Sequence, residues 1–363
     1  MRKPKAAHPR TSHLIFGCKF PTCRPLFWLA ATALLLASGC GSEDVDENRP
    51  LRVQVFTGAY SSMPVHVAVE KGFFQQQGLE VERLPANSSS AAIAALIGGS
   101  MDVVESAPDL VLANIDKGID LKYLVGNEST NYVTLVVGNH VPLSEHGRDG
   151  IVRQLAGRRI GVNAIGSTVY LAAVLILEEA GLAVEDVDFV ATGSAATTLS
   201  SWQTGAVDAQ MTFAPVPELL ETLGLARPAL VLADDGPPAL QYRGLYAGWV
   251  ANGELIGNQP ARADAFIAAM RDAIDWIREP ANHAEMLELA RRYAPVAALS
   301  EAQNRQVMDR MVRNYRRYWG YRISPDAIDL WNAYALRFNL IGERIPFADV
   351  VYAKAPTCTG TCQ

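Results

Sequence analysis

The chain has 363 residues, of which 49% are hydrophobic and 19% are charged, and its formal net charge is −6. This length suffices for two domains with cores of their own, and the apolar fraction excludes a disordered chain. Residues 1–40 carry six basic and no acidic side chains, so the rest of the chain, with 26 basic against 38 acidic residues, has a net charge of −12. A body this acidic is not expected to bind nucleic acid, because phosphate contacts need clustered Lys and Arg.

The N-terminal segment has the features of an export signal. Residues 26–37 are an apolar run that is too short to span a bilayer, and basic residues precede it. The small residues Ala37-Ser38-Gly39 before Cys40 resemble the lipobox of bacterial lipoproteins, in which the cysteine is acylated. We expect residues 1–39 to be a lipoprotein signal peptide, Cys40 to be lipidated and residues 40–50 to be a solvated tether. A plain secretory signal with an unmodified Cys40 and a retained membrane anchor are the alternatives.

The five cysteines lie near the two ends of the chain. Cys18, Cys23 and Cys40 are N-terminal, and no cysteine occurs between Cys40 and Cys358. Thiol catalysis and a cysteine-ligated metal in the core are therefore not expected. In an exported protein, the spacing of Cys358 and Cys362 predicts a small-loop disulfide in the tail, residues 356–363, without a role in function.

Strand-like and helix-like segments alternate from residue 51 to residue 125. Apolar runs typical of strands are followed by segments that start at Pro or Ser, as helices do. The order of these segments predicts a mostly parallel sheet covered by helices. The expected strands are residues 51–56, 79–84, 101–105 and 121–125, and the expected helices are residues 64–71, 88–97 and 108–117.

The alternation recurs after residue 158 with similar local sequences. Gly78-Leu79-Glu80-Val81 is echoed by Gly181-Leu182-Ala183-Val184, and Gly99-Ser100-Met101-Asp102-Val103 by Gly205-Ala206-Val207-Asp208-Ala209. In each copy a helix ends at glycine and a strand follows an aspartate that can cap the turn. These echoes predict two similar lobes. The second set of strands is expected at residues 159–163, 187–190 and 209–212, with helices at 168–180 and 195–204.

The last third of the sequence is mostly helical. Extended runs at 228–232 and 246–251 flank a turn-rich segment, residues 234–238, that suits a return crossover. Amphipathic spacing then predicts helices at residues 260–278, 281–293, 299–318 and 325–338. The predicted fold class is α/β, with two doubly wound lobes joined by two crossovers and a C-terminal helical region.

Four motifs resemble those of a known family, and they occur in the same order along the chain as in that family. The first, residues 64–81, contains the turn Glu70-Lys71-Gly72, two bulky residues and Gly78-Leu79-Glu80-Val81; the others are residues 94–103, 155–162 and 204–209. This pattern resembles substrate-binding proteins of the aliphatic sulfonate, taurine, nitrate and thiamine-pyrimidine import systems, over about residues 51–355.

The resemblance implies a periplasmic-binding-protein fold that closes by hinge motion over a small ligand. Such a protein delivers its ligand to an ABC permease and its ATPase, and it is no enzyme and needs no cofactor or metal. Residues 51–140 and 245–355 would form lobe 1, and residues 141–244 lobe 2 with the crossovers. We expect a monomer, exported and held on the membrane by its lipid.

The candidate ligand-binding residues lie in loops at the carboxyl ends of the expected strands, where open parallel sheets bind ligands. Hydroxyl groups dominate, although each could instead only cap a helix, and the two aromatic residues could be walls of the site or core. These residues are Tyr60, Ser61, Ser62, Ser88, Ser89, Ser106, Ser167, Thr168 and Phe213.

The sequence leaves the ligand open. The first loop, residues 58–62, lacks the Trp and His that members for thiamine pyrimidine carry, and no arginine lies in these loops. We expect a small polar anion such as a sulfonate, taurine or nitrate; a pyrimidine precursor, or a receptor that senses its ligand, is the alternative. Asn127-Glu128 is expected to be a solvated turn, and a buried Glu128 would favour an amine-bearing ligand.

Overall fold

The computed structural model of the chain describes residues 49–193, 195–296, 299–360 and 362. The expected signal peptide, the lipidation of Cys40 and almost all of the tether lie outside the described residues. Among the residues that the structure describes, no helix is both long and apolar enough to cross a bilayer.

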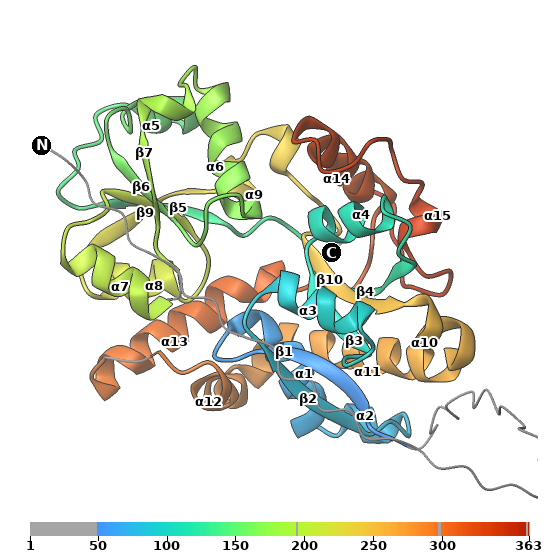
Figure 1. Cartoon of the computed structure of the whole chain (residues 1–363). Helices are drawn as coiled ribbons and strands as arrows, with labels where there is room; N and C mark the ends of the chain where they lie inside the picture. Colours follow the sequence, from blue (N-terminus) through green and yellow to red (C-terminus); the bar gives the residue numbers. More distant parts are fainter. Residues whose placement is uncertain (1–48, 194, 297–298, 361, 363) are drawn as a thin grey trace, which may run out of the picture. The chain divides into compact units, whose positions relative to one another are not determined.

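The first sheet has five strands in the order β2-β1-β3-β10-β4 (Figure 1). Strands β1 and β3 are parallel to their neighbours β2 and β1, whereas β10 is antiparallel to both β3 and β4. Such an antiparallel strand must return from elsewhere in the chain, which is what a crossover supplies. The strands are β1 (Leu51–Phe56), β2 (Val81–Ala86), β3 (Val103–Ser106), β4 (Leu121–Glu128) and β10 (Ala247–Asn252).

The helices around this sheet come from both ends of the chain. The core side chains of α11, such as Phe266 and Met270, are fully buried because its apolar residues recur with the helical period. The helices of this first lobe are α1 (Met63–Glu70), α2 (Phe73–Gln76), α3 (Ser89–Ile97), α4 (Pro108–Ile115), α10 (Gly253–Asn258), α11 (Pro260–Arg278), α14 (Pro325–Arg337) and α15 (Phe347–Val350).

The second sheet repeats this arrangement in the order β7-β6-β8-β5-β9. Its β5 is antiparallel to both neighbours, as β10 is in the first sheet. The strands are β5 (Thr134–Gly138), β6 (Arg159–Val162), β7 (Asp188–Ala191), β8 (Ala209–Thr212) and β9 (Ala226–Val231). The helices are α5 (Arg148–Arg153), α6 (Thr168–Glu179), α7 (Ala195–Gln203), α8 (Val216–Thr222) and α9 (Leu232–Asp235).

The predicted fold class is confirmed, but strand β5 corrects the predicted boundary of the lobes. Residues 134–138 were assigned to lobe 1, which was expected to extend to residue 140, whereas β5 pairs with β8 and β9 of the second sheet. All five residues of β5 are buried, so they show no alternation that marks a strand. The two sheets are joined by residues 129–133 and 232–246.

The echoed sequences of the two lobes have the same structural role. Asp102 accepts hydrogen bonds from the Arg52 backbone N–H at 2.7 Å and from its guanidinium. Asp208 does the same for Arg159, at 3.0 Å from the backbone N–H and 2.9 Å from Nε. Each aspartate thus ties the start of its own strand to the neighbouring strand. Hydrogen bonds from arginine lower the pKa of both carboxyls well below the usual range, although burial opposes the shift.

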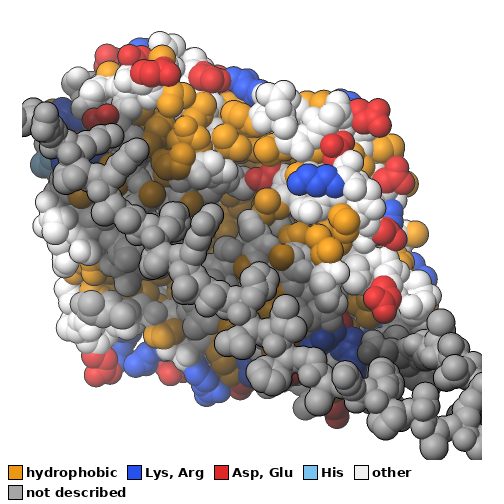
Figure 2. Space-filling model, viewed as in Figure 1, with side chains coloured by type: hydrophobic (Ala, Val, Ile, Leu, Met, Phe, Trp, Pro, Cys, Tyr) orange, Lys and Arg blue, Asp and Glu red, His pale blue; other side chains and the backbone are white. Residues whose placement is uncertain are grey.

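Two further helices follow α11, and one of them reaches the second lobe. Helix α12 (His283–Tyr293) packs on α1, and α13 (Glu301–Tyr315) packs on α12 and on α8 (Figure 1). A capping box at Ser300 and Gln303 starts α13, and the short helix η5 (Arg316–Tyr318) continues it. On the face in Figure 2, acidic and basic side chains lie interspersed around the margin.

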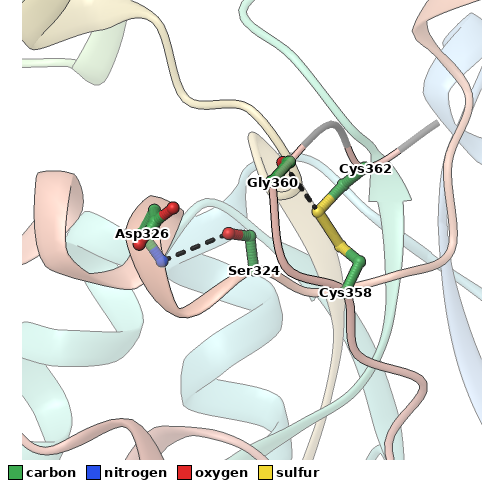
Figure 3. Close-up of a disulfide and its surroundings, with 5 residues drawn as sticks. All are labelled: Ser324, Asp326, Cys358, Gly360 and Cys362. Atoms are coloured by element: carbon green, nitrogen blue, oxygen red, sulfur yellow. Dashed lines mark hydrogen bonds between the residues drawn. A yellow bond between two sulfur atoms is a disulfide. The ribbon is translucent and has the colours of Figure 1, made fainter.

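The structure pairs Cys358 with Cys362 in a disulfide, with Cα atoms 5.6 Å apart (Figure 3). The backbone N–H of Cys358 donates to the carbonyl of Ile323 at 3.1 Å, so the tail lies beside the start of α14. A Cβ placed on Gly244, in the second crossover, would lie 3.2 Å from the Cys362 sulfur. The disulfide loop therefore packs against a connection between the lobes.

Candidate functional site

Two buried glutamates, Glu105 and Glu128, lie at the ends of β3 and β4 on either side of β10. Glu105 pairs with Trp249 and Glu128 pairs with Ala247, two residues apart on β10, so both carboxyls face the same side of the sheet. The register of β4 shifts at Asn127, which is the extra residue of a bulge. We call Glu105 and Glu128 the carboxyl pair.

Few hydrogen bonds satisfy the carboxyl pair. Glu105 accepts one from the Ser61 hydroxyl at 3.2 Å, and Glu128 accepts one from the Asn127 amide at 3.1 Å. Asn127 is itself held by the Ser61 carbonyl and by the Trp249 indole, at 2.9 and 3.1 Å. Glu128 is 0% exposed, and its Oε1 has no hydrogen-bond partner among the described residues. The expectation of a solvated turn at Asn127-Glu128 is therefore wrong.

Burial sets the protonation of the carboxyl pair. It raises the pKa of Glu105 to about 7, against the opposing hydrogen bonds from Ser61 and Asn127. Burial, and then the negative charge of Glu105, raise the pKa of Glu128 well above its ordinary value. Two carboxyls that share a site of low polarity do not both ionise easily, so they take up and release protons as one unit.

Aromatic side chains from both crossovers and from the end of α13 gather around the carboxyl pair. The ring centroids of Tyr132 and Tyr315 lie 4.9 Å apart, those of Tyr60 and Tyr315 lie 5.1 Å apart, and those of Tyr132 and Tyr246 lie 5.0 Å apart. The charge of Glu128 contributes to raising the pKa values of Tyr132 and Tyr315, after burial. We call this group the tyrosine cluster; it consists of Tyr60, Tyr132, Tyr246, Tyr315, Tyr318 and Trp319.

Two glycines allow the tyrosine cluster to approach the end of β4. The backbone N–H of Gly126 donates to the Tyr321 carbonyl, and that of Gly320 donates to the Asn127 carbonyl, both at 3.0 Å. A Cβ on Gly126 would lie 2.7 Å from the Gly320 oxygen, which is closer than real Cβ contacts. The segment after α13 therefore lies directly on the bulge and covers Glu128.

A cavity of about 360 Å³ adjoins the tyrosine cluster on the side of α8. Glu218, in the first turn of α8, is 6% exposed; its Oε2 has no hydrogen-bond partner among the described residues, and burial raises its pKa. The cavity is lined by Tyr132, Thr134, Ala214, Pro217, Glu218, Pro228, Val231, Arg313, Asn314, Tyr315, Arg317 and Tyr318.

Another buried carboxyl, that of Asp109, joins the two lobes. Asp109, in the first turn of α4, is 5% exposed and accepts a hydrogen bond from the Thr168 hydroxyl at the start of α6. The Tyr334 hydroxyl donates to the Thr168 carbonyl at 3.2 Å. Burial raises the pKa of Asp109 against the hydrogen bond from Thr168.

Four of the predicted hydroxyl groups form hydrogen bonds with nearby backbone groups of their own segments in this structure. Ser62 accepts from the Phe56 N–H at 2.9 Å, and Ser106 donates to the Ala107 carbonyl at 3.2 Å. Ser88 caps α3 and Ser167 caps α6, each accepting a backbone N–H of the first turn at 3.1 and 3.2 Å. Ser88 and Ser167 thus have the capping role that was the open alternative, whereas the Ser62 side chain makes no capping hydrogen bond and Ser106 is not the N-cap of α4.

The other predicted residues have different surroundings. Ser61 contacts the carboxyl pair, Tyr60 belongs to the tyrosine cluster, and Thr168 bonds Asp109. Phe213 is half-buried and lies edge-on to Tyr132 at 6.3 Å, whereas Ser89 is half-buried in the first turn of α3. Whether any of them touches a ligand stays a prediction.

Four residues of the site were not predicted from the sequence: Glu105, Tyr132, Glu218 and Tyr315. Glu105 carried a signal, because a charged residue in an otherwise apolar strand is seldom buried without a purpose. Tyr132 precedes an unrecognised strand, and the helical pattern around Glu218 and Tyr315 does not distinguish a site from ordinary packing.

Two five-stranded sheets with antiparallel β5 and β10, joined by two crossovers, form the architecture of periplasmic binding proteins. The family described as NMT1/THI5 like matches residues 60–284, and the chain belongs to this family. The comparison with curated proteins gave no match.

Solved structures of binding proteins have the same fold at low sequence identity. The alkanesulfonate-binding protein SsuA from Xanthomonas axonopodis pv. citri, bound to MOPS, is 18% identical with a TM-score of 0.65, over 84% of this chain and 98% of that one. The periplasmic aliphatic sulphonate-binding protein SsuA from Escherichia coli is 16% identical with a TM-score of 0.64, over 86% and 94%. The periplasmic nitrate-binding protein NrtA from Synechocystis PCC 6803 is 17% identical with a TM-score of 0.55, over 67% and 65%.

Proposed function

We propose that the protein is an extracytoplasmic solute-binding lipoprotein that captures a small molecule between its lobes and delivers it to an ABC importer. Membership of the NMT1/THI5-like family and a fold shared with sulfonate- and nitrate-binding proteins support this role. The observation that carries it is the buried Glu128, whose Oε1 has no hydrogen-bond partner among the described residues although segments far apart in the sequence surround it. A buried polar atom without a partner costs stability, so a ligand that satisfies it gives the arrangement a purpose.

The contacts between the lobes suit closure around a ligand. The Tyr315 hydroxyl, at the end of α13, accepts from the Ala214 N–H of the second lobe at 3.3 Å. An ion pair of 2.7 Å joins Arg310 of α13 to Glu221 of α8, and Thr168 bonds Asp109. These polar contacts would separate when the lobes rotate about the two crossovers, which opens the site for loading and release. This cycle needs binding and release and no covalent step.

The neighbours named as sulfonate- and nitrate-binding proteins support a small polar anion as the ligand, as the sequence resemblance does. The proposed lipid on Cys40 would keep the protein near a membrane permease. The permease and its ATPase are the partners that this role requires.

A thermal-shift screen of the purified protein tests the role. The probes are taurine, benzenesulfonate, nitrate, benzylamine, tyramine and an aminopyrimidine. A ligand that binds only the folded state raises the melting temperature by mass action. At a hundredfold excess over Kd, it adds about 2.7 kcal/mol to the free energy of unfolding. Stabilisation by at least one probe without its conversion supports a binding protein. Conversion of a probe to product, or a melting temperature that no compound changes, contradicts the proposal.

A further inference from the structure

The cavity beside α8 combines aromatic rings with a carboxylate that has a free oxygen. Tyr132, Tyr315 and Tyr318 all line it, and their ring centroids lie 4.9 Å, 6.1 Å and 5.4 Å apart in pairs. Glu218 lies among them, 6% exposed, with Oε2 unbonded within the described part of the chain. Its other oxygen accepts only a long hydrogen bond, 3.4 Å, from the Asn314 amide.

The arginines at this cavity are already neutralised. Arg313 pairs with Asp309 at 2.9 Å, and Arg317 pairs with Asp234 at 2.5 Å. Each guanidinium is therefore already paired with a separate carboxylate of the chain. Glu218 has no such ion pair among the described residues, so it is the acidic group at the cavity that remains available to pair with a cationic ligand.

Glu128 acts on one of the same aromatic rings as Glu218. Burial, then Glu128 and then Glu218 raise the pKa of the Tyr315 hydroxyl, so both carboxyls act on the same ring. Clefts lined by one sign of charge and walled by apolar rings concentrate the field and attract ions of the opposite sign. An anion in this cavity would face an unpaired carboxylate and lose its hydration.

We propose that this cavity binds a protonated organic amine, whose ammonium group pairs with the Glu218 carboxylate against the rings of Tyr132, Tyr315 and Tyr318. The inference rests on the proposed solute-binding role and assigns to this cavity an amine in place of the small polar anion. An ammonium group donates hydrogen bonds to the free oxygen and is attracted by the electron-rich rings, a combination that sulfonate or nitrate cannot make. The cavity volume of about 360 Å³ lies in the range of small-molecule sites and suits an amine with one ring or a short chain.

Titration of the purified protein with benzylamine, and with benzenesulfonate as its anionic counterpart, tests the inference. Both compounds carry one aromatic ring and differ in the sign of their charge. Benzylamine is expected to bind and to raise the melting temperature, and Glu218→Gln is expected to weaken its binding about tenfold or more. Glu185→Gln is the control, because Glu185 is an exposed carboxylate of the second lobe that does not line the cavity; the affinity of this variant should equal that of the wild type.

The melting temperature of Glu218→Gln without ligand shows that the variant is folded, and Glu218→Asp, which keeps the charge but withdraws it, should retain part of the affinity. Benzylamine binding that survives Glu218→Gln overturns the inference. Stabilisation by benzenesulfonate and not by benzylamine also overturns it and leaves the proposed function standing. If no compound of either charge binds, both proposals fail.

Discussion

Glu105 and Glu128 flank the same strand, β10, and face the same side of the first sheet, although they come from β3 and β4. Both are buried, and they share Asn127 as a neighbour. The Asn127 amide donates one hydrogen bond to Glu128 and another to the Ser61 carbonyl. Their proximity carries a cost in stability, because a buried carboxyl next to another does not ionise easily and Glu128 Oε1 lacks a hydrogen-bond partner among the described residues.

The carboxyl pair predicts that the folded protein loses stability as the pH rises. The pKa of Glu105 is raised from 4.5 to about 7, so its contribution is fully present below pH 4.5 and is lost as the pH rises through 7. Glu105→Gln cannot ionise, and its melting temperature should overtake that of the wild type over this window, by an equivalent of about 1–3 kcal/mol. Melting curves from about pH 4.5 to pH 8 measure this. The exposed Glu82→Gln is the control, and parallel curves for wild type and Glu105→Gln would contradict the assignment.

The paired aspartates predict the opposite dependence on pH. Asp102 and Asp208 have lowered pKa values, so their contribution is present above about pH 3.8 and declines as the pH falls below it. Asp208→Asn should cost about 1–3 kcal/mol at neutral pH and less in acid, since it loses charge-assisted hydrogen bonds to Arg159. Asp102→Asn should behave alike, because its bonds to Arg52 repeat those of the other lobe. Urea unfolding at pH 7 and pH 3 measures the free energy of unfolding, with the exposed Asp188→Asn as the control. An equal loss of stability at both pH values would contradict this prediction.

The close contact at Gly126 predicts a specific intolerance. Gly126→Ala would place a Cβ 2.7 Å from the Gly320 oxygen, which should force the segment over Glu128 outward and cost about 1–3 kcal/mol. Gly257, in helix α10, has open space where its Cβ would be, so Gly257→Ala should be neutral or stabilising by up to about 1 kcal/mol. Denaturant unfolding compares the two variants. A Gly126→Ala protein as stable as the wild type would rule out this packing.

The tail disulfide predicts a change in stability without a change in binding. The double variant Cys358→Ser, Cys362→Ser opens a loop of five residues and should lose about 2 kcal/mol or less, because short loops constrain the unfolded chain little. The ligand affinity should stay unchanged, since the hydrogen bonds of the carboxyl pair and of Glu218 go to Ser61, Asn127 and Asn314 and not to the described residues of the tail. The same unfolding and titration experiments serve here, and a large drop in affinity would show that the tail shapes the site.

The elements were predictable where the apolar pattern was periodic. Strand β1 and helix α11 begin and end at the predicted residues, because their alternating and helical periods are clear. Strand β5 was missed because it is buried on both faces and its five residues show no period. Local sequence also placed Tyr60 and Ser61 in the correct loop, at the carboxyl end of β1.

The chemistry of the site was less predictable because distant segments bury it. Glu128 reads as a solvated turn in its own neighbourhood, but a bulge and the segment after α13 cover it, and Ser129 bonds Tyr318 across 189 residues of sequence. Glu218 and Tyr315 occupy ordinary helical positions, and only the packing of α13 on α8 brings them to one cavity. Such contacts leave no local pattern.

Calorimetric titration of the purified protein with the probe that raises its melting temperature most is the direct test of the central claim. A solute-binding protein should give a saturable heat that ends at one ligand per chain, with the ligand recovered unchanged. A heat that continues without saturation while product accumulates, or no heat with any probe, would contradict the account.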